Sequence, residues 1–339
     1  MEKIKTSPLK LKSVKPKESN SLTKSENKSS IMGARRKKSI ILTSMCLPGA
    51  IWFILLRYLP MAGIVLAFKQ YKVYPKNPTF WSNLYHSKWV GFKNFEYLFK
   101  TQDALRAVRN TLVYNVIWIA MGLVLAVAFA IILNELRAKV AAKAYQTLMF
   151  FPYFLSWVVV SYFVLAFFDP TSGLVTSIRA ARGLPKIDWY NTPKYWPWIL
   201  TFANQWKNVG YSTILYLTAI VGIDRGQYEA AAIDGASWWQ QIRYVTLPNL
   251  APMISILLIM NVGKIFNSDF GLFYSVPMNS ASLYPATQTI DTYIYNVLTA
   301  TNNIGQSTAG GFLQNLVGFV CIMAANSIVR KIDEDSSLF

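Results

Sequence analysis

Six long apolar stretches constrain the fold of this chain more than any other feature of its sequence. A helix needs about 20 apolar residues to cross the roughly 30 Å hydrocarbon core of a bilayer. The stretches do not alternate apolar and polar residues with a period of two, as the strands of a membrane barrel would. We therefore predict an all-α, helical integral membrane protein with six transmembrane helices, at residues 40–68, 110–134, 144–168, 195–223, 250–270 and 307–329.

The first 38 residues differ in composition from the rest of the chain. They hold 12 Lys and Arg against 3 acidic residues, with many Ser, Asn and Thr and few large apolar side chains. Such a segment cannot bury enough apolar surface to fold alone. We predict a disordered basic tail over residues 1–38, in contact with anionic membrane lipid, and one six-span domain over residues 39–339.

The basic residues also predict the orientation in the membrane. An even number of spans places both termini on the same side. The tail and the segments assigned to that side hold 19 Lys and Arg, against 12 in the opposite loops, and the tail supplies the excess. Because cytoplasmic segments are enriched in Lys and Arg, we expect both termini in the cytoplasm.

Composition argues against several other classes of protein. A soluble nucleic-acid binder would explain the net charge of +18 but not the 53% hydrophobic content, so we expect no nucleic-acid partner. A single histidine, His86, and two distant cysteines, Cys46 and Cys321, indicate neither a metal site nor a disulfide framework. A membrane-embedded enzyme would need clustered carboxylates or histidines. Apart from Asp269 the spans lack them, so we predict no catalytic residue.

The loop at residues 222–249, between the fourth and fifth spans, has the pattern of two short helices joined by a hinge. Alanine-rich residues 228–233 favour a helix, and Asp234-Gly235 is a turn signal because Gly tolerates positive φ. Residues 236–244 resume a helical spacing, which we expect Pro248 and Pro252 to end before the next span. An exposed short helix with small side chains suits docking into a groove of a partner.

This loop resembles the EAA loop of permease subunits from binding-protein-dependent ABC importers. The family pattern is Glu-Ala-Ala, three residues, Gly, nine residues, Ile, any residue and Leu-Pro. The chain departs from it at Val245, which replaces Ile, and Asp-Gly-Ala at 234–236 is similar to the carbohydrate-uptake branch. The resemblance implies that the residues coupled to the ATPase are Glu229, Ala230, Ala231, Asp234, Gly235, Ala236, Leu247 and Pro248.

Shorter motifs over residues 40–335 resemble the complex-polysaccharide permease branch of the maltose-permease-like superfamily. They are Tyr-Leu-Pro-Met-Ala-Gly at 58–63, Ala-Phe-Lys-Gln-Tyr at 67–71, Gly-Phe-Lys-Asn-Phe at 91–95, Asn-Thr at 110–111, Asn-Glu-Leu-Arg at 134–137, Phe-Pro-Tyr-Phe-Leu-Ser-Trp at 151–157 and Asp-Thr-Tyr-Ile-Tyr at 291–295. The resemblance implies a type I ABC importer permease fold, multi-pass in a bacterial cytoplasmic membrane.

The resemblance also implies the partners and the activity. They are a second, homologous permease, two ATPase subunits and an extracellular solute-binding lipoprotein that delivers a sugar. The chain lacks a Gly-x-x-x-x-Gly-Lys-Ser/Thr phosphate loop, so we expect ATP and Mg on the partner ATPase and no cofactor on this chain. We expect import of oligosaccharides or polysaccharide fragments by alternating access. An ion-coupled secondary carrier and an ABC permease for a non-sugar substrate remain alternatives, although the inverted repeats common in carriers are not evident.

Polar residues within the spans are costly in lipid and tend to face a cavity. Sugars bind to aromatic faces and hydrogen-bonding groups, so we expect a substrate path along the fourth and fifth spans. Lys264 and Asp269 could pair with each other, or Lys264 could meet an anionic substrate. The alternative at each position is a hydrogen bond between helices. The candidate path residues are Asn204, Trp206, Tyr211, Asn261, Lys264 and Asp269.

Overall fold

The computed structural model describes residues 22–72, 79–136 and 138–332, and the chain divides into two compact units at residues 62 and 63. The first unit holds helix α1 (Leu22–Phe53), a π-helical segment (Ile54–Tyr58) and α2 (Leu59–Met61). Helix α1 begins at Leu22, so the described part of the expected disordered tail, residues 22–38, is helical. Residues 1–21 of that tail lie outside the described residues.

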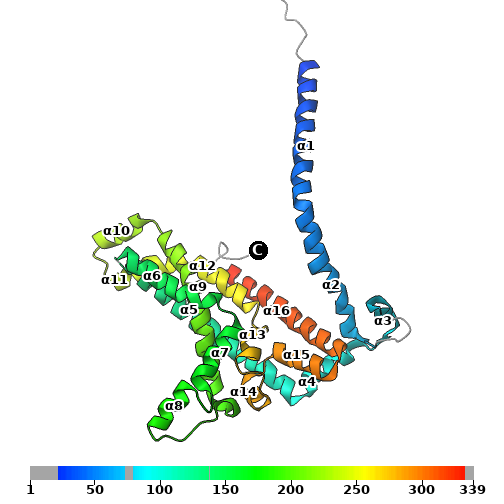
Figure 1. The fold of residues 1–339 in the computed structure, drawn as a ribbon. Coiled ribbons are helices and arrows are strands. Elements are labelled where there is room, and N and C mark those ends of the chain that lie inside the picture. Colours follow the sequence, from blue (N-terminus) through cyan, green and yellow to red (C-terminus); the bar gives the residue numbers. More distant parts are fainter. Residues whose placement is uncertain (1–21, 73–78, 137, 333–339) are drawn as a thin grey trace, which may run out of the picture. The chain divides into compact units, whose positions relative to one another are not determined.

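The second unit is a bundle of long helices joined by short ones, with one small strand pair (Figure 1). Strands β1 (Lys69–Gln70) and β2 (Lys88–Trp89) are antiparallel, with Lys69 opposite Trp89. The helices are α3 (Phe80–His86), α4 (Glu96–Lys100), α5 (Gln102–Glu135), α6 (Lys139–Phe150), α7 (Trp157–Phe168), α8 (Leu174–Ala181), α9 (Trp196–Val221), α10 (Arg225–Ile233), α11 (Trp238–Gln241), α12 (Leu247–Val262), α13 (Phe270–Ser275), α14 (Tyr284–Thr287), α15 (Ile290–Thr301) and α16 (Ile304–Ile332).

The core of this unit forms where α5 packs along α9. At one end of the pair, Trp118 and Leu200 lie in a buried cluster with Phe273. At the other end, Ala126 and Ala130 of α5 are fully buried with residues of α9 and α12. The small alanine side chains allow close helix packing, as is common in membrane bundles.

Several residues of the family motifs hold irregular backbone onto this bundle. The side-chain amide of Asn110 donates to the carbonyl oxygens of Pro285 and Gln288, at 3.2 and 3.0 Å. The Thr111 hydroxyl accepts the backbone N–H of Ile290 at 2.9 Å. Backbone polar groups in a membrane protein must be satisfied internally, so these side chains stabilise the turns before α15.

The structure confirms a helical membrane protein but not all six expected spans. Among the described residues, four helices are long and apolar enough to cross a membrane: Lys37–Phe68, Gln102–Glu135, Trp238–Val262 and Ile304–Lys331. The bent pair α6 and α7 is a fifth if it forms one span. Helix α9, the fourth expected span, has 26 residues but is not among these helices, and it carries polar residues such as Asn204 and Lys207.

The third expected span, residues 144–168, is not a straight helix. Helices α6 and α7 are bent by 100° around a 3₁₀ turn at Phe151–Phe154, and α7 restarts with its first turn capped by the Ser156 side chain. The break leaves the carbonyl of Tyr153 outside any helical ladder, and the Lys207 ammonium donates to it at 2.7 Å. The same ammonium lies 5.4 and 5.3 Å from the ring centres of Tyr153 and Trp157. Among the described residues Lys207 forms no ion pair, and these contacts surround its buried ammonium.

The prediction that Pro248 and Pro252 end a helix before the fifth span was wrong. The helix continues from Trp238 to Val262 through a π-helical turn at Ile242–Thr246, where the Leu247 N–H bonds to the Ile242 carbonyl. Proline lacks an N–H and clashes with the carbonyl four residues before it, so a wider turn lets the helix pass through. The fifth span therefore ends at Val262, and Lys264 and Asp269 lie beyond its end.

A π-helical turn also precedes a second Leu-Pro pair. The π-helical segment Ile54–Tyr58 ends directly before Leu59-Pro60, and the Leu59 N–H bonds to the Ile54 carbonyl. In the described part of the chain, each π-helical segment precedes a Leu-Pro pair. The arrangement keeps both helices continuous at a proline, where a kink or a stop would otherwise be expected.

We predict that Gly210→Ala destabilises the protein, whereas Gly311→Ala does not. A Cβ atom at Gly210 would lie 1.9 Å from the carbonyl oxygen of Met149 on α6, while a Cβ at Gly311 would meet nothing within 4 Å. Overpacking costs about 1–3 kcal/mol, and alanine gains about 1 kcal/mol of helix propensity at either site. Apparent melting temperatures of the purified variants measure the difference. Equal melting temperatures would contradict the close approach of α6 and α9.

Candidate functional site: a helical corner and a polar cavity

Helix α10 is capped at both ends. The Asp224 carboxylate accepts the Gly226 N–H at 3.0 Å at the start of the helix. At its end the Ala236 N–H bonds to the Ala231 carbonyl at 2.9 Å, and the Gly235 N–H bonds to that of Ala232 at 3.1 Å. Gly235 has φ of +76°, which completes a Schellman motif. The turn that the sequence predicts at Asp234-Gly235 is therefore present.

Helix α11 starts directly after this turn, and its first residues fix the corner between the two helices. The backbone N–H and the hydroxyl of Ser237 donate to the Gln240 side-chain oxygen, at 2.7 and 2.8 Å. The Gln241 amide donates to the Ala236 carbonyl at 3.2 Å. Reciprocal capping of this kind defines the entry angle of a helix. The corner of α10 and α11 is thus built from local hydrogen bonds.

Two side-chain hydrogen bonds tie α10 to the beginning of α12. The hydroxyls of Tyr228 and buried Thr246 share a hydrogen bond of 3.0 Å. The Asn249 amide donates to the Gln227 side-chain oxygen at 2.8 Å. A displacement of α10 therefore carries the start of α12 with it unless these bonds break.

The outer surface of the corner is both acidic and apolar. Ile233 and Trp239 are 86% and 72% exposed, respectively. Within the described residues the side chains of Glu229 and Asp234 make no hydrogen bond or ion pair. Exposed apolar and charged groups together suit a docking surface. Of the other predicted coupling residues, Ala231 and Ala236 are partly buried, and Ala230, Gly235, Leu247 and Pro248 are exposed.

A polar cavity of about 430 Å³ lies between α5, α9 and α12. This volume falls within the usual range for small-molecule sites. Four of the six predicted path residues line it together: Asn204, Tyr211, Asn261 and Lys264. The structure adds polar lining residues from three elements, namely Asn115, Tyr153, Gln205, Asn208 and Ser212.

One face of α9 presents open hydrogen-bonding groups to this cavity. Asn204, Asn208 and Ser212 follow each other at intervals of four residues, which places them on one side of the helix. Within the described part of the chain, these side chains and that of Asn261 form no hydrogen bond, so all remain available to a ligand. The Tyr211 ring stacks on Tyr153 with centroids 4.7 Å apart.

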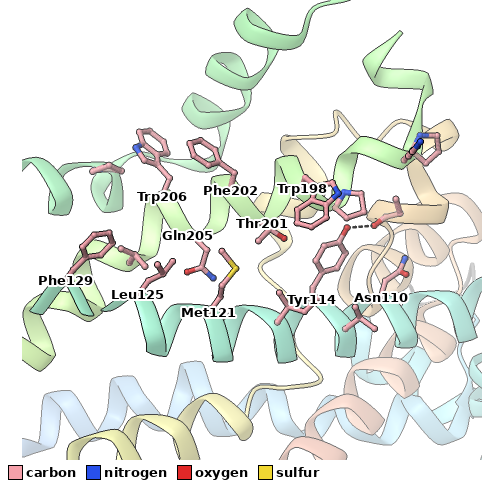
Figure 2. Close-up of a pocket in the computed structure, with 18 of the residues that line it drawn as sticks. Asn110, Tyr114, Met121, Leu125, Phe129, Trp198, Thr201, Phe202, Gln205 and Trp206 are labelled. Atoms are coloured by element: carbon pink, nitrogen blue, oxygen red, sulfur yellow. Dashed lines mark hydrogen bonds between the residues drawn. The ribbon is translucent and has the colours of Figure 1, made fainter. Parts of the chain in front are cut away.

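Trp206 and Asp269, the other two predicted path residues, lie elsewhere. Trp206 lines a separate, mostly apolar groove of about 1130 Å³ along α5, α6 and α9, with Phe202, Leu125 and Phe129 (Figure 2). Asp269 caps α13 and accepts the indole N–H of Trp157, so it forms no ion pair with Lys264. Trp206 and Asn204 are two residues apart on α9, about 200° apart around the helix, so helical periodicity alone could have separated them.

The sequence reasoning missed Asn115, Tyr153 and Ser212. Asn115 donates to the carbonyl oxygens of Ile265 and Asn267, at 2.8 Å each, and so fixes the non-helical segment after α12. A lone asparagine inside an otherwise apolar stretch was the available signal, because such a residue seeks a partner in the membrane.

Membrane-spanning helices around a polar cavity, with a capped helical corner at one end, define a membrane transport subunit. The comparisons give the family. The profile described as "binding-protein-dependent transport system inner membrane component" matches residues 122–333, more than half of the chain. The chain belongs to this family of ABC importer permeases.

Two relatives from Bacillus subtilis (strain 168) extend the similarity beyond the matched domain. Protein LplB is 31% identical over 302 residues, which cover 89% of this chain and 92% of that protein. The polygalacturonan/rhamnogalacturonan transport system permease protein YteP is 32% identical over 291 residues, covering 86% and 88%. The second of these relatives is named as a transport permease rather than an enzyme.

A solved structure supports the same fold. It is a bacterial ABC transporter involved in the import of the acidic polysaccharide alginate, with a TM-score of 0.78 and 31% sequence identity. The match covers 89% of this chain and 99% of that chain. A second structure, the alginate transporter in complex with an alginate pentasaccharide-bound periplasmic protein, has a TM-score of 0.77, 32% identity and coverages of 87% and 96%.

We predict that Gly235→Ala lowers uptake by the reconstituted transporter at least threefold, while Gly226→Ala leaves it unchanged. A side chain at φ of +76° costs about 1–2 kcal/mol, and it favours a different direction for the chain after α10. Gly226 lies in the helix without positive φ, and a Cβ there meets only ordinary contacts with Asp224. Uptake and membrane abundance are measured side by side. Equal uptake by both variants at equal abundance would show that the left-handed turn is dispensable.

Proposed function

We propose that this chain is a permease subunit of an ATP-driven importer of oligosaccharides or polysaccharide fragments. It spans a bacterial cytoplasmic membrane with both termini in the cytoplasm. The transport systems named for its relatives act on polygalacturonan, rhamnogalacturonan and alginate, which supports a carbohydrate substrate. The open amide and hydroxyl groups of the cavity suit sugar hydroxyls, and Tyr153 and Tyr211 supply aromatic faces.

One observation carries the proposal: a single helix links the corner to the cavity. The continuous helix that contains α12 is bonded to α10 at Thr246 and Asn249, and it reaches the cavity at Leu257 and Asn261. Fifteen residues of helix span about 22 Å at 1.5 Å per residue. A rigid element of this length transmits a displacement at the corner to the cavity wall.

The proposed cycle follows from this link. Two partner ATPase subunits bind ATP and Mg, and one of them holds the corner of α10 and α11. Closure of the ATPase pair moves α10, α12 follows, and the cavity opens to the opposite side of the membrane. A second, homologous permease completes the path, and an extracellular solute-binding lipoprotein delivers the sugar. The alginate transporter structure with a periplasmic protein supports the last partner.

Crosslinking to the ATPase tests the docking role of the corner. In a background with Cys46→Ser and Cys321→Ser, we introduce Ile233→Cys or Val140→Cys, at positions that are 86% and 85% exposed. Both positions belong to segments that we assign to the cytoplasmic side. A reagent that links a thiol to a nearby amine is expected to join the Ile233→Cys variant to the ATPase and the Val140→Cys variant much less.

Uptake measurements complete this test. The reconstituted complex is expected to import oligosaccharide only when ATP is supplied on the side of the corner. Uptake that proceeds without ATP and follows an ion gradient would overturn the proposal in favour of a secondary carrier. Equal crosslinking of the two cysteine variants would remove the corner as the docking surface.

A further inference from the structure

The polar cavity contains one unpaired positive charge. Within the described chain, Lys264 is the only basic residue that lines the cavity, and no acidic side chain lines it. In the same part of the chain, Lys264 forms no ion pair and its ammonium has no hydrogen-bond partner. Lys264 lies beyond the end of α12 and is exposed, so its ammonium is open to a ligand that enters the cavity.

The acidic residue closest in sequence does not serve as that anion. Asp269 accepts the indole N–H of Trp157 and caps the first turn of α13. The other lysine near the cavity differs from Lys264, because Lys207 is buried and its ammonium donates to the Tyr153 carbonyl at 2.7 Å. Lys264 is therefore free for a ligand, whereas Lys207 is engaged by the fold.

The segment that carries Lys264 is held in place from three sides. Asn115 of α5 binds the carbonyl oxygens of Ile265 and Asn267, and the Gln314 amide of α16 donates to the Phe266 carbonyl at 2.7 Å. The backbone N–H of Ser268 donates to the Asp291 carboxylate at 2.6 Å. A charged group on a fixed backbone loses less freedom when it binds, which favours its use as a recognition element.

The neutral groups beside Lys264 determine what kind of anion fits. Asn204, Asn208 and Ser212 on α9, with Asn261 on α12, offer hydrogen-bond donors and acceptors without charge. This row of neutral polar groups can bind several successive hydroxyl groups of one sugar chain. A small inorganic anion would leave most of these groups unused.

We propose that the cavity takes an acidic carbohydrate and that Lys264 binds a carboxylate of its uronate residues. This inference rests on the function proposed above and narrows its substrate class. An ammonium and a carboxylate form a charge-assisted hydrogen bond, which is stronger than a neutral one and stronger still out of water. The amide row on α9 then holds the hydroxyls of the same sugar.

Uptake of a charged sugar and its neutral counterpart tests the inference. The probes are oligogalacturonides and the same oligomers with each carboxyl reduced to a primary alcohol, supplied to the complete transporter in proteoliposomes. Wild type is expected to import the acid at least tenfold faster. Lys264→Gln is expected to bring the two rates within twofold by slowing the acid, and Lys264→Arg to retain most of the preference. Lys194→Gln, which lies on the separate apolar groove, is the matched control and is expected to behave as wild type.

A second measurement does not depend on delivery by the solute-binding protein. Ser212→Cys, a near-isosteric change in the cavity lining that keeps Lys264, is labelled in the Cys46→Ser and Cys321→Ser background with a small water-soluble thiol reagent in the assembled permease. The acidic oligomer is expected to slow labelling at least fivefold, and the reduced oligomer is expected to have little effect. Equal protection by inorganic phosphate would overturn the assignment of a sugar carboxylate.

The outcomes separate this inference from the function on which it rests. Import of neutral oligomers but not of acidic ones, or a Lys264→Gln variant that keeps its preference for the acid, would overturn the inference and leave a sugar importer. Import of neither class under ATP would contradict both. Preference for the acid that disappears in Lys264→Gln, together with protection of Ser212→Cys by the acid, supports the inference.

Discussion

The hydrogen bond from the Lys207 ammonium to the Tyr153 carbonyl is the interaction on which the arrangement of the site depends. A membrane offers no water to a carbonyl released from a helix, so a break within a span needs an internal donor. Lys207 supplies that donor at 2.7 Å, between the rings of Tyr153 and Trp157. Helices α6 and α7 can therefore meet at a bend of 100°, and Tyr153 is brought against Tyr211 at the cavity wall.

Continuity of α12 is the complementary constraint. A helix that kinked at Pro248 or stopped there would separate the corner from the cavity. The π-helical turn at Ile242–Thr246 instead accommodates the Leu-Pro pair without ending the helix. Thr246, inside that turn, is also the residue that bonds to Tyr228 of α10. The Leu-Pro of the loop motif thus marks the place where the corner of α10 and α11 is joined to a span, rather than the end of a helix.

The sequence predicted those features that local chemistry determines. The long apolar stretches predicted the long helices. The Asp234-Gly235 pair predicted the turn between α10 and α11, because the left-handed backbone conformation at that position favours glycine. The bend at residues 151–156 was not foreseen, because the donor for the freed Tyr153 carbonyl is Lys207, which is distant in sequence and meets it only in the folded bundle. Trp206 was grouped with Asn204 for its chemistry alone, although residues two apart lie on nearly opposite sides of a helix, and the structure places the two in different hollows.

The two lysines near the cavity show how the same side chain acquires opposite roles. Lys207 projects from the middle of a helix toward a broken span, where a free carbonyl and two aromatic rings surround its charge. Lys264 follows the end of α12, on a segment whose own backbone carbonyls are already bonded to Asn115 and Gln314. With its neighbouring acceptors occupied, the Lys264 charge is left facing the cavity, and the same polar residues that fix the segment thereby keep its ammonium available to a ligand.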